Sequence, residues 1–121
     1  MGLSIRTNRL RSVIQQQLLT KCPSVFYRKA KNAVGDHVVF VIDSFTANET
    51  VNVLSLEVRV IGTGDDTAAV ENLADDIWEM FDHFYYVADD IEFAVYQNMR
   101  SVVEEDDSVI YRRLVFEARA L

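Results

Sequence analysis

Residues 67–84 read TAAVENLADDIWEMFDHF and form the most regular segment of the sequence. Hydrophobic residues recur every three or four positions, which predicts a helix with one apolar face. That face would carry Val70, Leu73, Ala74, Ile77, Phe81 and Phe84. The opposite side would carry an acidic stripe of Glu71, Asp75, Glu79 and Asp82. A helix with such a face has to pack against a second apolar layer.

A second amphipathic helix is predicted over residues 3–21, where apolar residues again recur near a period of 3.6. Ser4 is a suitable N-cap. Cys22-Pro23 ends the pattern, because the residue before a proline avoids the α region. Its arginines and glutamines lie mostly off the apolar face.

Five segments between and after these helices are predicted to be strands, and in three of them the residues alternate between two faces, most clearly over 51–61. They cover residues 24–31, 37–45, 51–61, 91–99 and 109–120. The order α-β-β-β-α-β-β predicts a single α+β domain over residues 1–121, with two layers. We expect a mostly antiparallel sheet with both helices on one face.

The core of this domain should be formed by the inward positions of both helices and of the alternating strands. The expected members are Leu10, Ile14, Leu18, Leu54, Leu56, Val58, Leu73, Ile77, Phe81, Phe93, Leu114 and Phe116.

Composition favours a packed protein over a disordered one, since 50% of the residues are hydrophobic and there is one proline. The single cysteine, Cys22, cannot form an internal disulfide, which fits a reducing compartment. We find neither an apolar run of membrane-spanning length nor a signal peptide. The expectation is a protein made in a cytoplasm, with no membrane partner.

Charge is divided unevenly along the chain. Residues 1–31 contain seven basic side chains and no acidic one, whereas residues 32–121 contain five basic and nineteen acidic ones. The two parts therefore carry +7 and −14 within a net charge of −7. This asymmetry predicts a face that meets an oppositely charged partner. Alternatively, the basic start packs beside the acidic remainder of its own chain.

Residues capable of catalysis are few and scattered. His37, His83 and Cys22 have no neighbours at the spacing of a metal site or a catalytic pair. Gly62-Thr63-Gly64 follows a predicted strand but lacks the third glycine and the lysine of phosphate-binding loops. We therefore expect no enzymatic activity, no cofactor and no metal. The alternative is a small enzyme or ligand-binding domain with a pocket between the helices and the sheet.

We expect the arginines of the first helix to bind a partner, because positive charge at a helix N-terminus opposes the helix dipole and does not stabilise the helix. Nucleic acid is disfavoured by the acidic isoelectric point of about 4.7. A membrane surface is disfavoured by the lack of Trp and Phe on the apolar face of this helix. An acidic protein fits best, and the acidic body of a second subunit is one such partner.

Two stretches and the order of elements carry a family resemblance. AVENLADDI at residues 69–77, YRRLVFEAR at residues 111–119 and the α-β-β-β-α-β-β order resemble the tail-terminator, or tail-completion, proteins of long-tailed bacteriophages. The resemblance implies a hexameric ring in the virion that caps the tail tube protein. It also implies that the ring joins the tail to the head connector or stopper protein and lets DNA pass without specific binding. Another neck or tail-tube protein, or an accessory module of a contractile-injection or toxin system, are the alternatives.

Two groups of residues are predicted to make the contacts. In a head-to-tail ring, the basic group of one subunit faces the acidic group of the next, namely Arg6, Arg9, Arg11 and Arg28 against Glu71, Asp75 and Glu79. The turns are predicted to contact the tube and the connector, or to line the channel, with Gly35, Asp36, Asp65, Asp66, Glu104, Glu105, Asp106 and Asp107 as candidates. The last four are interpreted as a hairpin tip, which could equally be solvated only.

Overall fold

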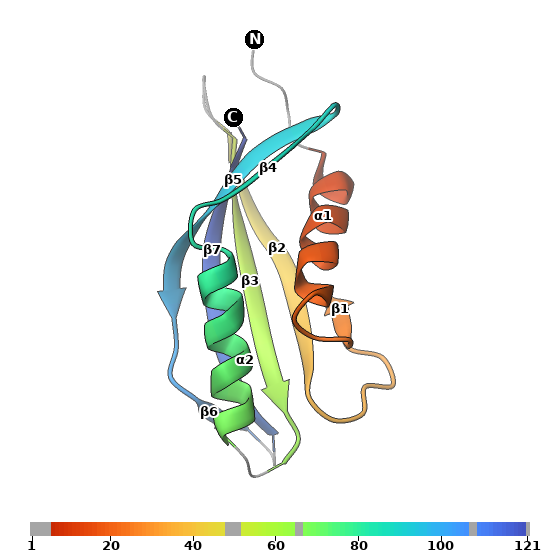
Figure 1. Ribbon diagram of the computed structural model, residues 1–121, viewed down its shortest axis with the longest axis vertical. Coiled ribbons are helices and arrows are strands. Elements are labelled where there is room, and N and C mark those ends of the chain that lie inside the picture. Colours follow the sequence, from red (N-terminus) through yellow and green to blue (C-terminus); the bar gives the residue numbers. More distant parts are fainter. Residues whose placement is uncertain (1–5, 48–51, 65–66, 107–108, 121) are drawn as a thin grey trace.

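The computed structural model describes residues 6–47, 52–64, 67–106 and 109–120 (Figure 1). Within them, helices α1 (Thr7–Leu19) and α2 (Thr67–Met80) lie over one face of a curled, mostly antiparallel sheet. Its strands are β1 (Val25–Tyr27), β2 (His37–Ala47), β3 (Asn52–Gly62), β4 (Phe84–Ala88), β5 (Ile91–Arg100), β6 (Glu104–Asp106) and β7 (Val109–Ala120). Their spatial order is β1-β2-β3-β7-β5-β4, with β6 also paired to β7. The predicted α+β class is confirmed.

One hydrophobic core lies between the sheet and the two helices. The predicted core residues are buried, except that Leu73 is half-buried at the edge of the cluster. Every second residue of β3 and β7 faces the helices, as the alternation predicted. Gly62, at the end of β3, allows α2 to start close to the sheet. A Cβ atom there would come within 2.5 Å of the Val70 side chain.

The first predicted strand is shorter than expected, since only Val25–Tyr27 of residues 24–31 form a strand. The reason is a three-residue turn centred on Arg28. Its φ of 68° is left-handed, and the Lys29 N–H donates to the Tyr27 carbonyl at 2.8 Å. This turn takes the chain out of the sheet and into the connection to β2, which runs parallel to β1.

Both helices are also shorter than predicted. The second ends at Met80 instead of residue 84, because His83 has a left-handed φ of 55° that redirects the chain into β4. Phe84 belongs to β4, although its ring still packs edge-on against Phe81 at 5.5 Å. Phe84 was predicted as part of the helix because it continues the spacing of the apolar helix residues, although it lies in a strand. The first helix begins at Thr7 with Arg6 as its N-cap, and Ser4 lies outside the described residues.

The acidic run 104–107 is not simply a hairpin tip. Glu104–Asp106 forms the short strand β6, which pairs with β7 so that Glu104 lies opposite Tyr111. Asp107 lies outside the described residues. Four consecutive acidic residues are typical of a turn. Here three of them form a strand because they pair with β7, in which apolar residues alternate regularly.

Candidate interaction surface

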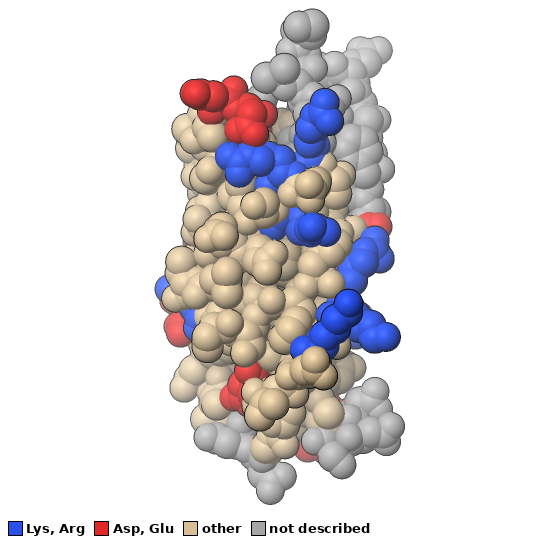
Figure 2. Space-filling view, turned by 90° about the vertical axis from the view of Figure 1, so that its right-hand side faces the viewer, with Lys and Arg blue, Asp and Glu red and all other residues tan. Residues whose placement is uncertain are grey.

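Exposed cations gather on the side of the molecule that carries α1 and β1. Figure 2 views this side, where Lys and Arg side chains run down the face and the largest acidic group lies at its upper left. We define the basic patch as Arg6, Arg11, Arg28 and Lys29, which are all exposed. It is formed by α1 together with the turn that follows β1.

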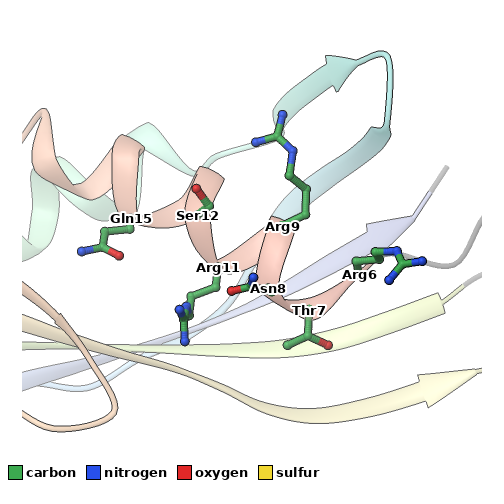
Figure 3. Close-up of a pocket in the computed structure, with 7 residues that line it drawn as sticks. All are labelled: Arg6, Thr7, Asn8, Arg9, Arg11, Ser12 and Gln15. Atoms are coloured by element: carbon green, nitrogen blue, oxygen red, sulfur yellow. The ribbon is translucent and has the colours of Figure 1, made fainter.

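The N-terminal half of α1 lines a surface hollow of about 800 Å³ (Figure 3). Its walls carry arginine, amide and hydroxyl side chains, from Arg6, Thr7, Asn8, Arg9, Arg11, Ser12 and Gln15. The first turn of α1 contains no acidic residue, and the N-cap Arg6 makes no side-chain capping hydrogen bond. Positive side chains therefore stand at the positive end of the helix dipole.

Arg9 differs from its neighbours because it is already paired within the chain. Its Nε donates to Asp90 Oδ2 at 2.7 Å, and Nη2 lies 3.3 Å from Oδ1. The hydrogen bond from Arg9 lowers the pKa of the Asp90 carboxyl below its ordinary value. The pair attaches the β4–β5 turn to α1, which is what the own-chain alternative predicted for the basic start.

Tyr27 organises the other half of the basic patch. The guanidinium carbon of Arg11 lies 4.9 Å from the centre of its ring, and that of Arg28 lies 5.6 Å away. Cation–π contacts of this kind hold the side chains in place but leave their charges unneutralised. Arg28 also occupies a left-handed conformation that non-glycine residues rarely adopt. Such strain concentrates at functional positions.

The acidic residues predicted to receive these cations lie on α2. Glu71 and Glu79 are exposed, whereas Asp75 already binds two arginines of its own chain. Its Oδ1 accepts from Arg112 at 2.9 Å and lies 3.4 Å from Arg100. The Arg112 side chain is only 10% exposed and also donates to the Ser101 carbonyl at 2.9 Å. Asp75 is therefore engaged in ion pairs within its own chain, where it balances the charge of the nearly buried Arg112.

Three of the predicted contact turns lie at the same end of the molecule. The register places His37 opposite Ile61 and Gly62 opposite Ile110, while Ile110 also pairs with Glu105 of β6. The connection 32–36, the end of β3 and strand β6 are therefore neighbours, at the lower end of Figure 1. Gly35 takes a left-handed φ of 76° there, and Asp36 is exposed. Asp65 and Asp66 lie outside the described residues, as does the Asp106 side chain.

The scattered candidates for catalysis stay apart. His37 is buried, with Nδ1 2.9 Å from the Gly35 carbonyl oxygen, and Cys22 is buried beside Ser24. His83 is exposed and contacts Asp82. Among the described residues, no group of three His, Cys, Asp or Glu side chains could hold a metal ion. Neither described helix is long and apolar enough to cross a membrane.

Sequence reasoning missed Tyr27, Asp90 and the role of Arg112. For Arg112 a signal was present, since the alternation of β7 placed a charged residue on the buried face. A buried cation needs a carboxylate partner. Tyr27 and Asp90 gave no such signal, because their contacts join segments that are distant in the sequence.

Neither a protein-family model nor a curated protein matches this chain. A solved structure is similar in fold, with a TM-score of 0.74 over 98% of this chain and 97% of that chain, at 11% sequence identity. The name of that protein is a serial designation that describes no activity. At this level of identity the similarity shows a shared fold alone.

Proposed function

We propose that this chain is a structural protein of a phage tail that assembles head to tail into a ring and terminates the tail tube. The observation that carries the proposal is the basic patch of exposed cations, in which Arg11 and Arg28 are held against Tyr27 and Arg28 occupies a strained turn. Strain of this kind persists only where the surrounding structure enforces it. A patch whose cations form no ion pair with the described acidic side chains, and two of whose members are already held in place, is suited to binding an acidic protein surface.

Charge disfavours a symmetric dimer through this surface. In a two-fold contact the same patch lies on both subunits, so the basic patch would face itself. A head-to-tail contact instead places it against the acidic surface of the next subunit, where Glu71 and Glu79 are exposed. Repetition of that contact closes a ring if the rotation allows. Charge would set specificity and association rate, and apolar contacts would supply much of the affinity.

The turns at one end of the molecule support the same proposal. In a ring, the connection 32–36, the end of β3 and strand β6 of every subunit would lie on one rim, ready to contact the tube or the connector. The chemistry is binding throughout, and DNA would pass through the centre without a specific site. The same features would suit another neck protein of the same machine.

A small ligand-binding or enzymatic domain is the competing proposal, with its pocket between helices and sheet. In the described residues that space holds the packed side chains of both helices and of the sheet. The hollow beside α1 is instead on the surface. We therefore favour assembly.

The test measures assembly and stability of the same variant, Arg28→Gly. Glycine adopts the left-handed turn without strain. The free energy of unfolding of the variant should therefore be about 1 kcal/mol higher than that of the wild type. It should also assemble less well, because a cation of the basic patch is gone. Sedimentation velocity over a concentration series, with negative-stain microscopy for rings, reads assembly. Denaturant unfolding reads stability.

Asn32→Gly is the matched control, since Asn32 is also left-handed and exposed but uncharged. It should change stability slightly and leave assembly unchanged. A charge exchange sharpens the test: Arg11→Glu should impair assembly, and mixing it with Glu71→Arg/Glu79→Arg should restore mixed rings. A wild-type protein that remains monomeric at every concentration, both alone and in the presence of tail tubes, would contradict the proposal.

A further inference from the structure

Strand β4 lies at one edge of the sheet, and no other described strand covers its outer side. It reads Phe-Tyr-Tyr-Val-Ala over Phe84–Ala88 and contains neither a charged residue nor a proline. Among the described strands only β5 pairs with it, so alternate N–H and C=O groups of β4 point away from the sheet. Soluble proteins usually protect such edges with charges, prolines or bulges, because a bare edge pairs with another strand.

The side chains of β4 strengthen this point. Tyr85 is 53% exposed and Val87 is 59% exposed, and both are among the large hydrophobic side chains that the described part of the chain exposes. They project from the face of the strand opposite to Phe84 and Tyr86, which pack on the core. A strand added to β4 would cover part of both side chains and satisfy the outward backbone groups.

This edge is held in a fixed position before any partner binds. The Tyr85 hydroxyl donates to the Glu92 carboxylate of β5, and β4 pairs with β5 along its whole length without a bulge. At the turn, Asp90 is fixed by Arg9 of α1. Pre-organisation of this kind lowers the entropy lost on association.

The charges around the edge select its occupant. Residues 60–99 contain ten acidic side chains and neither Lys nor Arg, and Asp82 and Asp89 flank β4 at its two ends. If β4 paired antiparallel with β4 of a second copy, these aspartates would face each other and repel. A partner strand should therefore be flanked by cations.

The strand at the other end of the same sheet meets this requirement. Of the strands that the structure describes, β2 alone pairs with β1, which is followed directly by Arg28 and Lys29. We infer that β4 of one subunit binds the β1 edge of a second copy of this chain, so that the sheet continues from subunit to subunit. The inference rests on the proposed head-to-tail assembly and specifies its contact.

The test places a charge on the edge without disturbing the core. Val87→Lys should weaken self-association roughly tenfold or more, because lysine on an edge strand blocks strand addition. Val102→Lys is the matched control, because Val102 is 80% exposed but lies in a connection between strands. It should assemble like the wild type. Sedimentation equilibrium measures the association constants, and circular dichroism verifies that both variants fold.

Amide hydrogen exchange supplies the second measurement. In assembled wild-type protein, the amides of β4 and β1 should exchange more slowly than in dilute protein, while those of the connection around Val102 should not change. If the wild type assembles and Val87→Lys assembles equally well, this inference fails and the ring proposal stands. If the wild type never assembles, both fail. A symmetric dimer with protection confined to β4 would show that the occupant is wrong.

Discussion

Helices α1 and α2 cover the same face of one sheet, yet their charges are opposite. The first carries Arg9 and Arg11 in its N-terminal half, and its N-cap is Arg6. The second carries Asp76 and Glu79 in its C-terminal half and has no basic residue in its last turn. Each helix thus places its charges at the end where they oppose its own dipole, which costs a few tenths of a kcal/mol per charge.

In both helices the charges interact unfavourably with the helix dipole. They do not stabilise the helices that carry them, and for each helix only part of the set forms ion pairs with other described residues. Arg9 forms an ion pair with Asp90, and Asp75 forms ion pairs with Arg112 and Arg100. The remaining members are exposed. The following experiments can break or sharpen this comparison.

The largest effects should come from the apolar faces, where the two helices are alike. Ile14 of α1 and Ile77 of α2 are fully buried in the same core cluster. Truncation of either to Ala should lower the free energy of unfolding by about 2–5 kcal/mol, through lost burial and a cavity. Chemical denaturation should show one transition for both variants. Leu19→Ala, at an exposed position of α1, is the control.

A second transition in the Ile14→Ala protein would mean that α1 forms a separate cooperative unit. Equal losses in single transitions would support one core that both helices share.

The start of α2 should be the next most sensitive place. Gly62→Ala would bring a methyl group within 2.5 Å of Val70 Cγ2 and 3.2 Å of Ile110 Cγ1, so α2 would have to move. We expect a loss of about 1–3 kcal/mol from overpacking. Gly64→Ala is a matched control, because nothing lies within 4 Å of a Cβ there. Thermal unfolding of the Gly62→Ala and Gly64→Ala variants tests this expectation. Equal unfolding midpoints would mean that α2 can shift freely.

Correcting the helix charges should raise stability and lower assembly. Arg6→Asp introduces an N-cap side chain and a favourable charge, which should stabilise the fold by about 1 kcal/mol. Glu79→Lys should stabilise α2 by about 0.3–1 kcal/mol. Each should weaken self-association measured by sedimentation. Arg6→Asn, which caps α1 without reversing the charge, separates capping from charge. A fall in stability would instead assign these charges an intramolecular role.

The smallest effect should be a response to acid at the β4–β5 turn. Because Arg9 lowers the pKa of Asp90 in the folded protein, the pair stabilises the turn fully above the ordinary Asp range. That contribution is lost as pH falls through the lowered pKa. The protection factors of the turn amides should therefore fall below about pH 4 more in the wild type than in Asp90→Asn, which lacks the pair at every pH. Identical profiles would show that the pair does not fix the turn.

The long, regular elements were predictable because their patterns depend on local periodicity. Strand β7 and the apolar face of α2 are examples, and both directed the correct residues to the core. Short elements were not predictable. Strand β1 is limited by the left-handed turn at Arg28, and β4 begins after a left-handed His83, and neither conformation has a signature in those residue types.

The candidate surface was predicted in sign but not in detail. The sequence places the cations near the N-terminus, and the side chains of Arg6, Arg11 and Arg28 are exposed, while their role as a contact surface stays a prediction. It could not separate them from Arg9, because the partner Asp90 lies far along the chain. Pairing of that kind is a property of the tertiary fold.

The position of β7 has a consequence for how the protein is made. Strands β3 and β5 do not pair with each other, and among the described strands β7 joins the β1-β2-β3 part of the sheet to the β5-β4 part. A nascent chain that has emerged only as far as β6 therefore has two unjoined halves with exposed apolar faces. The pairing of Val53 with Arg119 closes a long loop late in synthesis, and such distant contacts form slowly. We expect the growing polypeptide to depend on chaperones until its residues 109–120 have left the ribosome.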